Sequence, residues 1–128
     1  MTREQKLFKG LILADIRAAN TALLSKNKAD KLLASYHAQQ AVEKIIKLKA
    51  GILGLNLWGH NIVKLLSECK RAGIYDRLKV PYLINKNAKM YTSWEADCRY
   101  YPTTVVNRRS VEAALRVCLE WLNSDETK

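Results

Sequence analysis

The sequence has few cysteines, fewer acidic than basic residues and no long apolar run. Cys69, Cys98 and Cys118 are odd in number, widely separated and without metal-binding spacing, which predicts free thiols and a cytoplasmic location. With only two histidines and no C-x-x-C pair, we expect no metal site. No apolar stretch approaches the roughly 20 residues that cross a bilayer, and no apolar segment before Lys9 suggests a signal peptide. We therefore expect no membrane association.

Several motifs of catalysis and cofactor binding are also missing. The sequence contains no P-loop, no Rossmann glycine pattern and no nucleophile elbow. Gly51, Gly54 and Gly59 are spaced wrongly for a phosphate cradle, so we interpret them as a helix cap and a connection. We accordingly predict no cofactor.

What the sequence has in excess is positive charge. Lys and Arg number 22 against 12 Asp and Glu, which gives a net charge of +10. Such a surplus favours polyanions, either nucleic acid or an acidic protein surface, although a solvated surface without a ligand remains the alternative. One segment is especially cationic, with Asp76 as its only acid, and we predict a phosphate-contacting surface there: Lys70, Arg71, Arg77, Lys79, Lys86 and Lys89.

Apolar residues recur at three- and four-residue steps, which predicts five helical segments. Thr2 and Gln5 match a capping box for the first, which runs to about residue 24. The second spans about 29–50, with Gly51 as its C-terminal cap, and its buried face includes Leu33. The others span about 61–72, a short stretch from about residue 80, and about 107–123, whereas 85–94 is expected to be a loop or a frayed helix.

No strand-like alternation is sustained anywhere in the sequence. We therefore predict an all-α fold, an up-and-down bundle of four to five helices. Residues 1–123 are expected to form one domain, because 128 residues can bury a core. Residues 124–128 have little to bury and are expected to fray.

The second predicted helix contains an unusually polar stretch, residues 35–44 (SYHAQQAVEK). A polar group left dry and unpaired costs about 1–3 kcal/mol, so these side chains need partners. Two interpretations are open. In one, the side chains line a nucleotide or RNA pocket; in the other, they bond to neighbouring helices and fix the packing register. The candidate residues are His37, Gln40, Glu43 and Lys44.

Two further places offer candidate contacts. His60 lies at the predicted start of a helix, where it would contact a phosphate or cap the helix together with Asn61. Arg99 follows Tyr91 and Trp94 and precedes Tyr101. These residues would clamp phosphate and stack bases, or form a packed corner in which Arg99 pairs with Glu43.

Three stretches together resemble the HEPN family, the higher-eukaryote and prokaryote nucleotide-binding domain. Residues 35–44 are similar to its central-helix signature, F/Y-H-A-Q-Q-A-x-E-K. Residues 59–66 resemble its G-H-D/N-L-x-x-L segment, and residues 98–102 its R-Y-P turn. The stretches occur in family order and cover most of the chain. The resemblance implies a helical bundle and a homodimer.

Many members of that family are ribonucleases that use an Arg followed, after four to six residues, by a His. The positions that would complete this motif around His37, His60 and Arg99 are 30–32, 53–55 and 104–106, and none holds the required residue. The ribonuclease motif is absent, which favours a protein that is not an enzyme.

The resulting hypothesis is a non-catalytic binding module for a nucleotide, RNA or a partner protein. The resemblance further implies a minimal nucleotidyltransferase as partner, in a toxin–antitoxin-like pair. The alternative is a metal-independent RNase toxin whose site is rearranged around His37 or His60 with Arg99.

Overall fold

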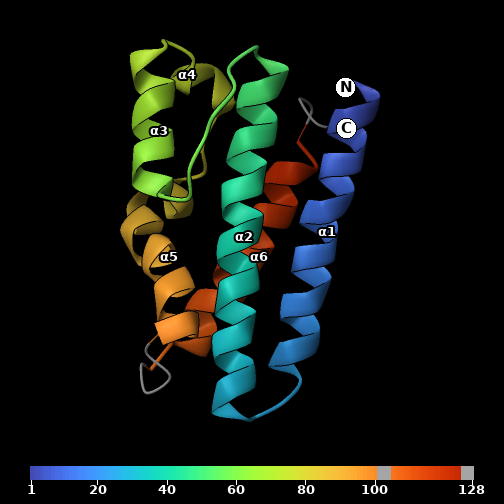
Figure 1. Cartoon of the computed structure of the whole chain (residues 1–128), viewed down its shortest axis with the longest axis vertical. Coiled ribbons are helices and arrows are strands. Elements are labelled where there is room, and N and C mark those ends of the chain that lie inside the picture. The colour runs from blue at the N-terminus through green and yellow to red at the C-terminus, as the bar shows by residue number, and fades with distance from the viewer. Residues whose placement is uncertain (101–104, 125–128) are drawn as a thin grey trace.

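A computed structural model describes residues 1–100 and 105–124, without the side chains of residues 97–100. Within this part, every regular element is a helix, which confirms the all-α prediction (Figure 1). The six helices are α1 (Arg3–Leu23), α2 (Lys28–Ile52), α3 (Ile62–Arg71), α4 (Tyr75–Leu78), α5 (Tyr82–Tyr100) and α6 (Arg108–Leu122). No described helix is long and apolar enough to cross a membrane.

Helix α2 is the centre of the bundle. It pairs with α1 as an antiparallel hairpin and also contacts α3, α5 and α6. In Figure 1, α1 lies on one side of α2, α3 and α5 lie on the other, and α6 passes behind. Because α2 is covered on most sides, its buried residues include polar ones such as Ser35, Gln39 and Glu43. The polar stretch found in the sequence therefore lies in the middle of the fold.

The helix ends follow local capping chemistry. Thr2 and Gln5 form the predicted capping box, with bonds of 3.0 and 3.1 Å between each backbone N–H and the other side chain. The predicted cap at Gly51 is wrong, because this residue lies inside α2. A positive φ, which glycine adopts more easily than other residues, is found instead at Gly54 (φ 91°). Gly73 (φ 77°) follows α3 in the same way.

The largest error of sequence interpretation concerns α5. Residues 85–94, expected to be a loop or a frayed helix, belong to a continuous helix. Ile84, Ala88, Tyr91 and Trp94 recur at steps of four and three, and all are buried. Burial of this stripe stabilises the helix despite its many polar residues. The single turn α4 was also not predicted.

Smaller corrections concern the core and the C-terminus. Leu33 was expected to be buried but is exposed, and Leu32 takes its place in the core. Leu11, an apolar residue of α1, is likewise exposed. Ser124, assigned to the frayed tail, is half-buried and accepts a hydrogen bond from Lys49 Nζ (2.6 Å). Residues 125–128 lie outside the described part.

Candidate functional site

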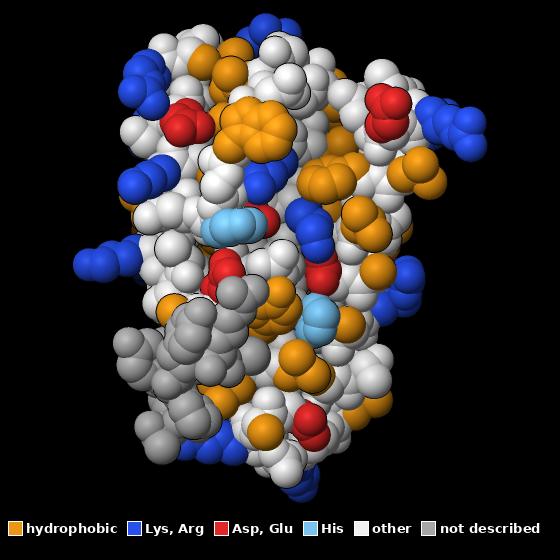
Figure 2. Space-filling view, viewed as in Figure 1, with side chains coloured by type: hydrophobic (Ala, Val, Ile, Leu, Met, Phe, Trp, Pro, Cys, Tyr) orange, Lys and Arg blue, Asp and Glu red, His pale blue; other side chains and the backbone are white. Residues whose placement is uncertain are grey.

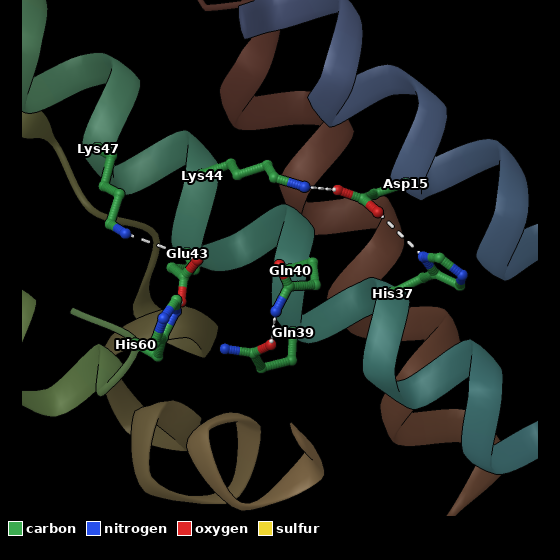
Figure 3. A network of polar contacts seen from close by, with 8 residues as sticks. All are labelled: Asp15, His37, Gln39, Gln40, Glu43, Lys44, Lys47 and His60. Carbon is green, nitrogen blue, oxygen red and sulfur yellow. Dashed lines mark hydrogen bonds and ion pairs between the residues drawn. The ribbon is translucent and has the colours of Figure 1, made fainter. Parts of the chain in front are cut away.

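Asp15 joins α1 to α2 through two charged contacts. It falls on the apolar stripe of α1 beside Ile12 and Ile16, so its carboxylate faces α2. Oδ1 of Asp15 is 2.9 Å from His37 Nδ1, and Oδ2 accepts from Lys44 Nζ at 2.5 Å. The Asp15 side chain is only 11% exposed. Both partners are on α2, so the trio ties the two longest helices together (Figure 3).

Glu43, the residue before Lys44 on α2, is the centre of a second group. Its side chain is 4% exposed, and its Oε1 lies 2.7 Å from Nδ1 of His60. Its Oε2 lies 3.7 Å from Lys47 Nζ. Glu95 of α5 is also close, since one ligand atom from each of Glu43, His60 and Glu95 lies within 4.8 Å of the others. His60 is the outer member, with a side chain 68% exposed.

Gln39 and Gln40 lie between these two groups in Figure 3. Gln40 Nε2 donates to Gln39 Oε1 at 2.7 Å. Gln39 is fully buried, and its Nε2 has no hydrogen-bond partner among the described residues. We call the eight residues drawn in Figure 3 the polar network: Asp15, His37, Gln39, Gln40, Glu43, Lys44, Lys47 and His60.

The polar network combines internal pairing with access to solvent. The contacts of His37 and Lys44 with Asp15 match the packing interpretation of residues 35–44. His37 and Lys44 are nevertheless about one-quarter exposed, at 25% and 23%. Figure 2 shows both histidines of the chain on one face of the molecule, among Lys, Arg and acidic side chains.

The predicted cation-rich segment forms a second region on α3, α4, α5 and the residue after α4. All six cations are exposed. Two tyrosines lie beside them: Lys70 Nζ is 4.7 Å from the centroid of the Tyr75 ring, and Lys86 Nζ is 5.7 Å from that of Tyr82. Tyr82 is 72% exposed. We call this region the basic surface: Lys70, Arg71, Tyr75, Arg77, Lys79, Tyr82, Lys86 and Lys89.

The predicted aromatic contacts lie elsewhere than expected. Tyr91 and Trp94 are buried, with ring centroids 5.0 Å apart, so the hypothesis that they stack bases is wrong. Burial also raises the pKa of Tyr91. They belong to the core because the α5 stripe faces α2. The side chain of Arg99, with its expected pairing to Glu43, and all of Tyr101 lie outside the described part.

His60 and Asn61, which were expected to cap α3 together, have different roles at the start of this helix. Asn61 is the N-cap, and its Oδ1 accepts from the backbone N–H of Lys64 at 3.1 Å. His60 does not cap the helix but faces Glu43.

Sequence interpretation missed several residues of both regions. Asp15 carried a signal, because it is a lone acid within the apolar stripe of α1, where a carboxylate needs a partner. Gln39 lay within the quoted signature but was not singled out. Glu95 could not be found without α5, and Tyr75 and Tyr82 carried no signal beyond their neighbouring lysines.

Comparisons with known proteins agree with this architecture. The chain is similar to the crystal structure of TT1696 from Thermus thermophilus, with a TM-score of 0.70 and 23% identity over 94% of each chain. At this identity the likeness shows the fold alone. No curated protein matches the sequence significantly. The family model described as "HEPN domain" matches residues 14–124. That match includes α2 and its polar signature and covers most of the chain, so the protein belongs to the HEPN domain family.

Proposed function

We propose that this protein is a non-catalytic RNA-binding module and that the basic surface is its contact. The observation that carries the proposal is the gathering of six exposed cations beside two tyrosines on consecutive elements. Cations near phosphates release condensed counterions, which drives binding without sequence preference. A tyrosine face stacks on any base.

The charge of the polar network argues against that region as the main phosphate contact. Its acids already have partners: Asp15 contacts His37 and Lys44, and Glu43 contacts His60 and Lys47. A phosphate would have to displace a carboxylate that is almost buried. The basic surface imposes no such exchange, since the cations of its helices project into solvent.

The extent of the basic surface favours a strand over a single nucleotide. Its cations come from three helices and from Lys79, which follows α4. One nucleotide would engage only a few of them. A cavity of about 330 Å³ lined by Lys70, Gly73, Tyr75 and Asp76 offers one place for a base or sugar.

A titration of labelled single-stranded RNA at several salt concentrations tests the proposal. Each phosphate contact contributes a slope of about −0.7 to log K against log salt. An Arg77→Ala/Lys86→Ala variant should therefore weaken binding and reduce the slope by about 1.4. Arg17→Ala/Lys26→Ala is the matched control, because it removes the same charge from exposed positions at α1 and the α1–α2 turn. Equal curves for the two double variants would refute the basic surface as the contact.

One observation favours the RNase alternative as a second candidate. Both histidines contact a carboxylate through Nδ1, which leaves Nε2 as the nitrogen that could exchange a proton. Our proposal predicts intact RNA after incubation with the pure protein in the presence of a chelator. Cleavage that is lost in His37→Ala or His60→Ala would instead establish the ribonuclease.

We also propose that the protein forms a homodimer, on the evidence of large apolar side chains that are exposed. Trp58 is 83% exposed and Leu7 is 65% exposed. A groove of about 580 Å³ beside Trp58 is lined by α1, the end of α2 and the segment after it. Large exposed aromatics are favoured at interfaces. Sedimentation equilibrium should give twice the chain mass, and Trp58→Ala should lower it; a mass near 14.6 kDa for the unaltered protein would contradict the proposal.

A minimal nucleotidyltransferase remains a proposed partner, supported by the net charge of +10, which suits an acidic protein. Co-expression and pull-down with a neighbouring gene product of that kind tests it. Absence of co-purification would leave RNA binding as the only supported role.

A further inference from the structure

Three metal-ligating side chains from three separate segments meet at one end of the polar network. Glu43 comes from α2, Glu95 from α5, and His60 from the segment before α3. One ligand atom of each lies within 4.8 Å of the others, and His60 Nδ1 is 2.7 Å from Glu43 Oε1. The group is graded in depth, with Glu43 buried, Glu95 half-buried and His60 exposed. A cation could therefore enter this point from solvent on the side of His60, and the buried Glu43 would hold it on the inner side.

The donor set indicates which cation fits. Two ligands at about 2.1 Å from one ion lie about 3.4 Å apart in a tetrahedron, a separation that small rotations of the flexible Glu side chains can reach. One imidazole with two carboxylates suits borderline divalent ions such as Zn²⁺ or Mn²⁺. Ca²⁺ and Mg²⁺ prefer oxygen ligands alone. We propose that Glu43, His60 and Glu95 form a binding site for a divalent transition-metal ion.

Gln39 supplies an independent observation. It is fully buried, four residues before Glu43 on the same face of α2, and its Nε2 lacks a partner among the described residues. In Figure 3 this nitrogen points away from Gln40, toward the side on which Glu43 and His60 lie. An unpaired buried donor costs about 1–3 kcal/mol. A carboxylate oxygen turned by the ion gives Gln39 Nε2 the acceptor it needs.

Lys47 is the competitor for this site. Its Nζ lies 3.7 Å from Glu43 Oε2, where it neutralises the buried carboxylate. The Lys47 side chain is 22% exposed and long enough to turn into solvent when a divalent cation takes over that role. Removing the Lys47 charge should therefore strengthen metal binding, whereas a purely structural Glu43–His60 pair predicts no metal binding at all.

Isothermal titration calorimetry of the metal-free full chain with ZnCl₂, and separately with MnCl₂, tests the site. We expect one ion per chain with at least one of these metals. His60→Ala and Glu95→Gln should each weaken binding at least about 10-fold, and Gln39→Leu about 10-fold. Lys47→Met should tighten it. His37→Ala is the matched control, because it removes the other carboxylate-paired histidine, and it should bind like the unaltered protein.

A thermal-unfolding series provides the second readout. The bound ion should raise the Tm of the unaltered protein and of His37→Ala, because a ligand that binds only the folded state stabilises it. The ion should leave the Tm of His60→Ala unchanged. His60 is exposed, so its replacement is expected to leave the fold intact. Absence of heat with both metals, or equal affinity in the two histidine variants, would overturn the proposal.

Discussion

The polar network and the basic surface show two ways in which one chain handles its charges. In the network, charges lie between helices, and each described acid faces a cation within 4 Å. On the basic surface, cations project into solvent, and the segment that carries them has a single acid, Asp76. Buried charges must be paired, so they constrain how helices pack. Exposed cations contribute little to folding, which leaves them available for a ligand.

The largest expected difference between the polar network and the basic surface is in their contribution to stability. Asp15→Ala should lower the free energy of unfolding by about 2 kcal/mol, because it leaves His37 and Lys44 without their anion in a partly buried place. Asp76→Ala makes the same chemical change on the exposed basic surface and should cost less than about 0.5 kcal/mol. Urea denaturation of the three proteins measures both. Similar losses for the two variants would remove the distinction between the regions.

The sequence predicted the fold where local signals agreed with tertiary packing. The capping box at Thr2 and the apolar stripes of α3 and α6 each placed an element to within a few residues. Helix α5 was missed because Asn85 and Asn87 lower its local helix propensity. Its stripe at residues 84, 88, 91 and 94 becomes decisive only when α2 is there to cover it.

The candidate site was only partly predicted, because its contacts also depend on how the helices pack. His37, Glu43 and Lys44 stand out because polar groups are rare among small apolar residues in a central helix. Their partners Asp15 and His60 lie 22 and 17 positions away, and only the packing of α1 and of the segment before α3 against α2 brings them together. The cations of the basic surface were predictable because they lie close together in the sequence, with Asp76 as the only acid among them.

A second prediction tests whether the hydrophobic core beneath both regions excludes water. Cys118 of α6 is fully buried, and burial raises the pKa of its thiol from 9.0 to about 12. Above pH 9 the unfolded chain loses this proton while the native protein keeps it, so stability falls as pH rises toward 12. At pH 10 this difference in pKa lowers the free energy of unfolding by about 1.4 kcal/mol.

Denaturation of the unaltered protein and Cys118→Ala at pH 8 and pH 10 isolates that contribution, since other titrating groups are common to both. The variant should start less stable, because it leaves a small cavity, but its stability should decline less between the two values. Parallel declines would mean that water reaches the thiol.

The smallest expected effect separates aromatic from ionic contacts on the basic surface. Tyr82 is largely exposed, so Tyr82→Ala should change the free energy of unfolding by less than about 0.5 kcal/mol. RNA affinity should nevertheless fall by about 1 kcal/mol, since one base loses its stacking partner. The slope of log K against log salt should stay the same, because no phosphate contact is removed. Tyr82→Phe keeps the ring and should bind RNA like the unaltered protein. Equal binding by Tyr82→Ala would confine recognition to the cations, and a reduced slope would show that Tyr82 acts by positioning Lys86, whose ammonium lies over its ring.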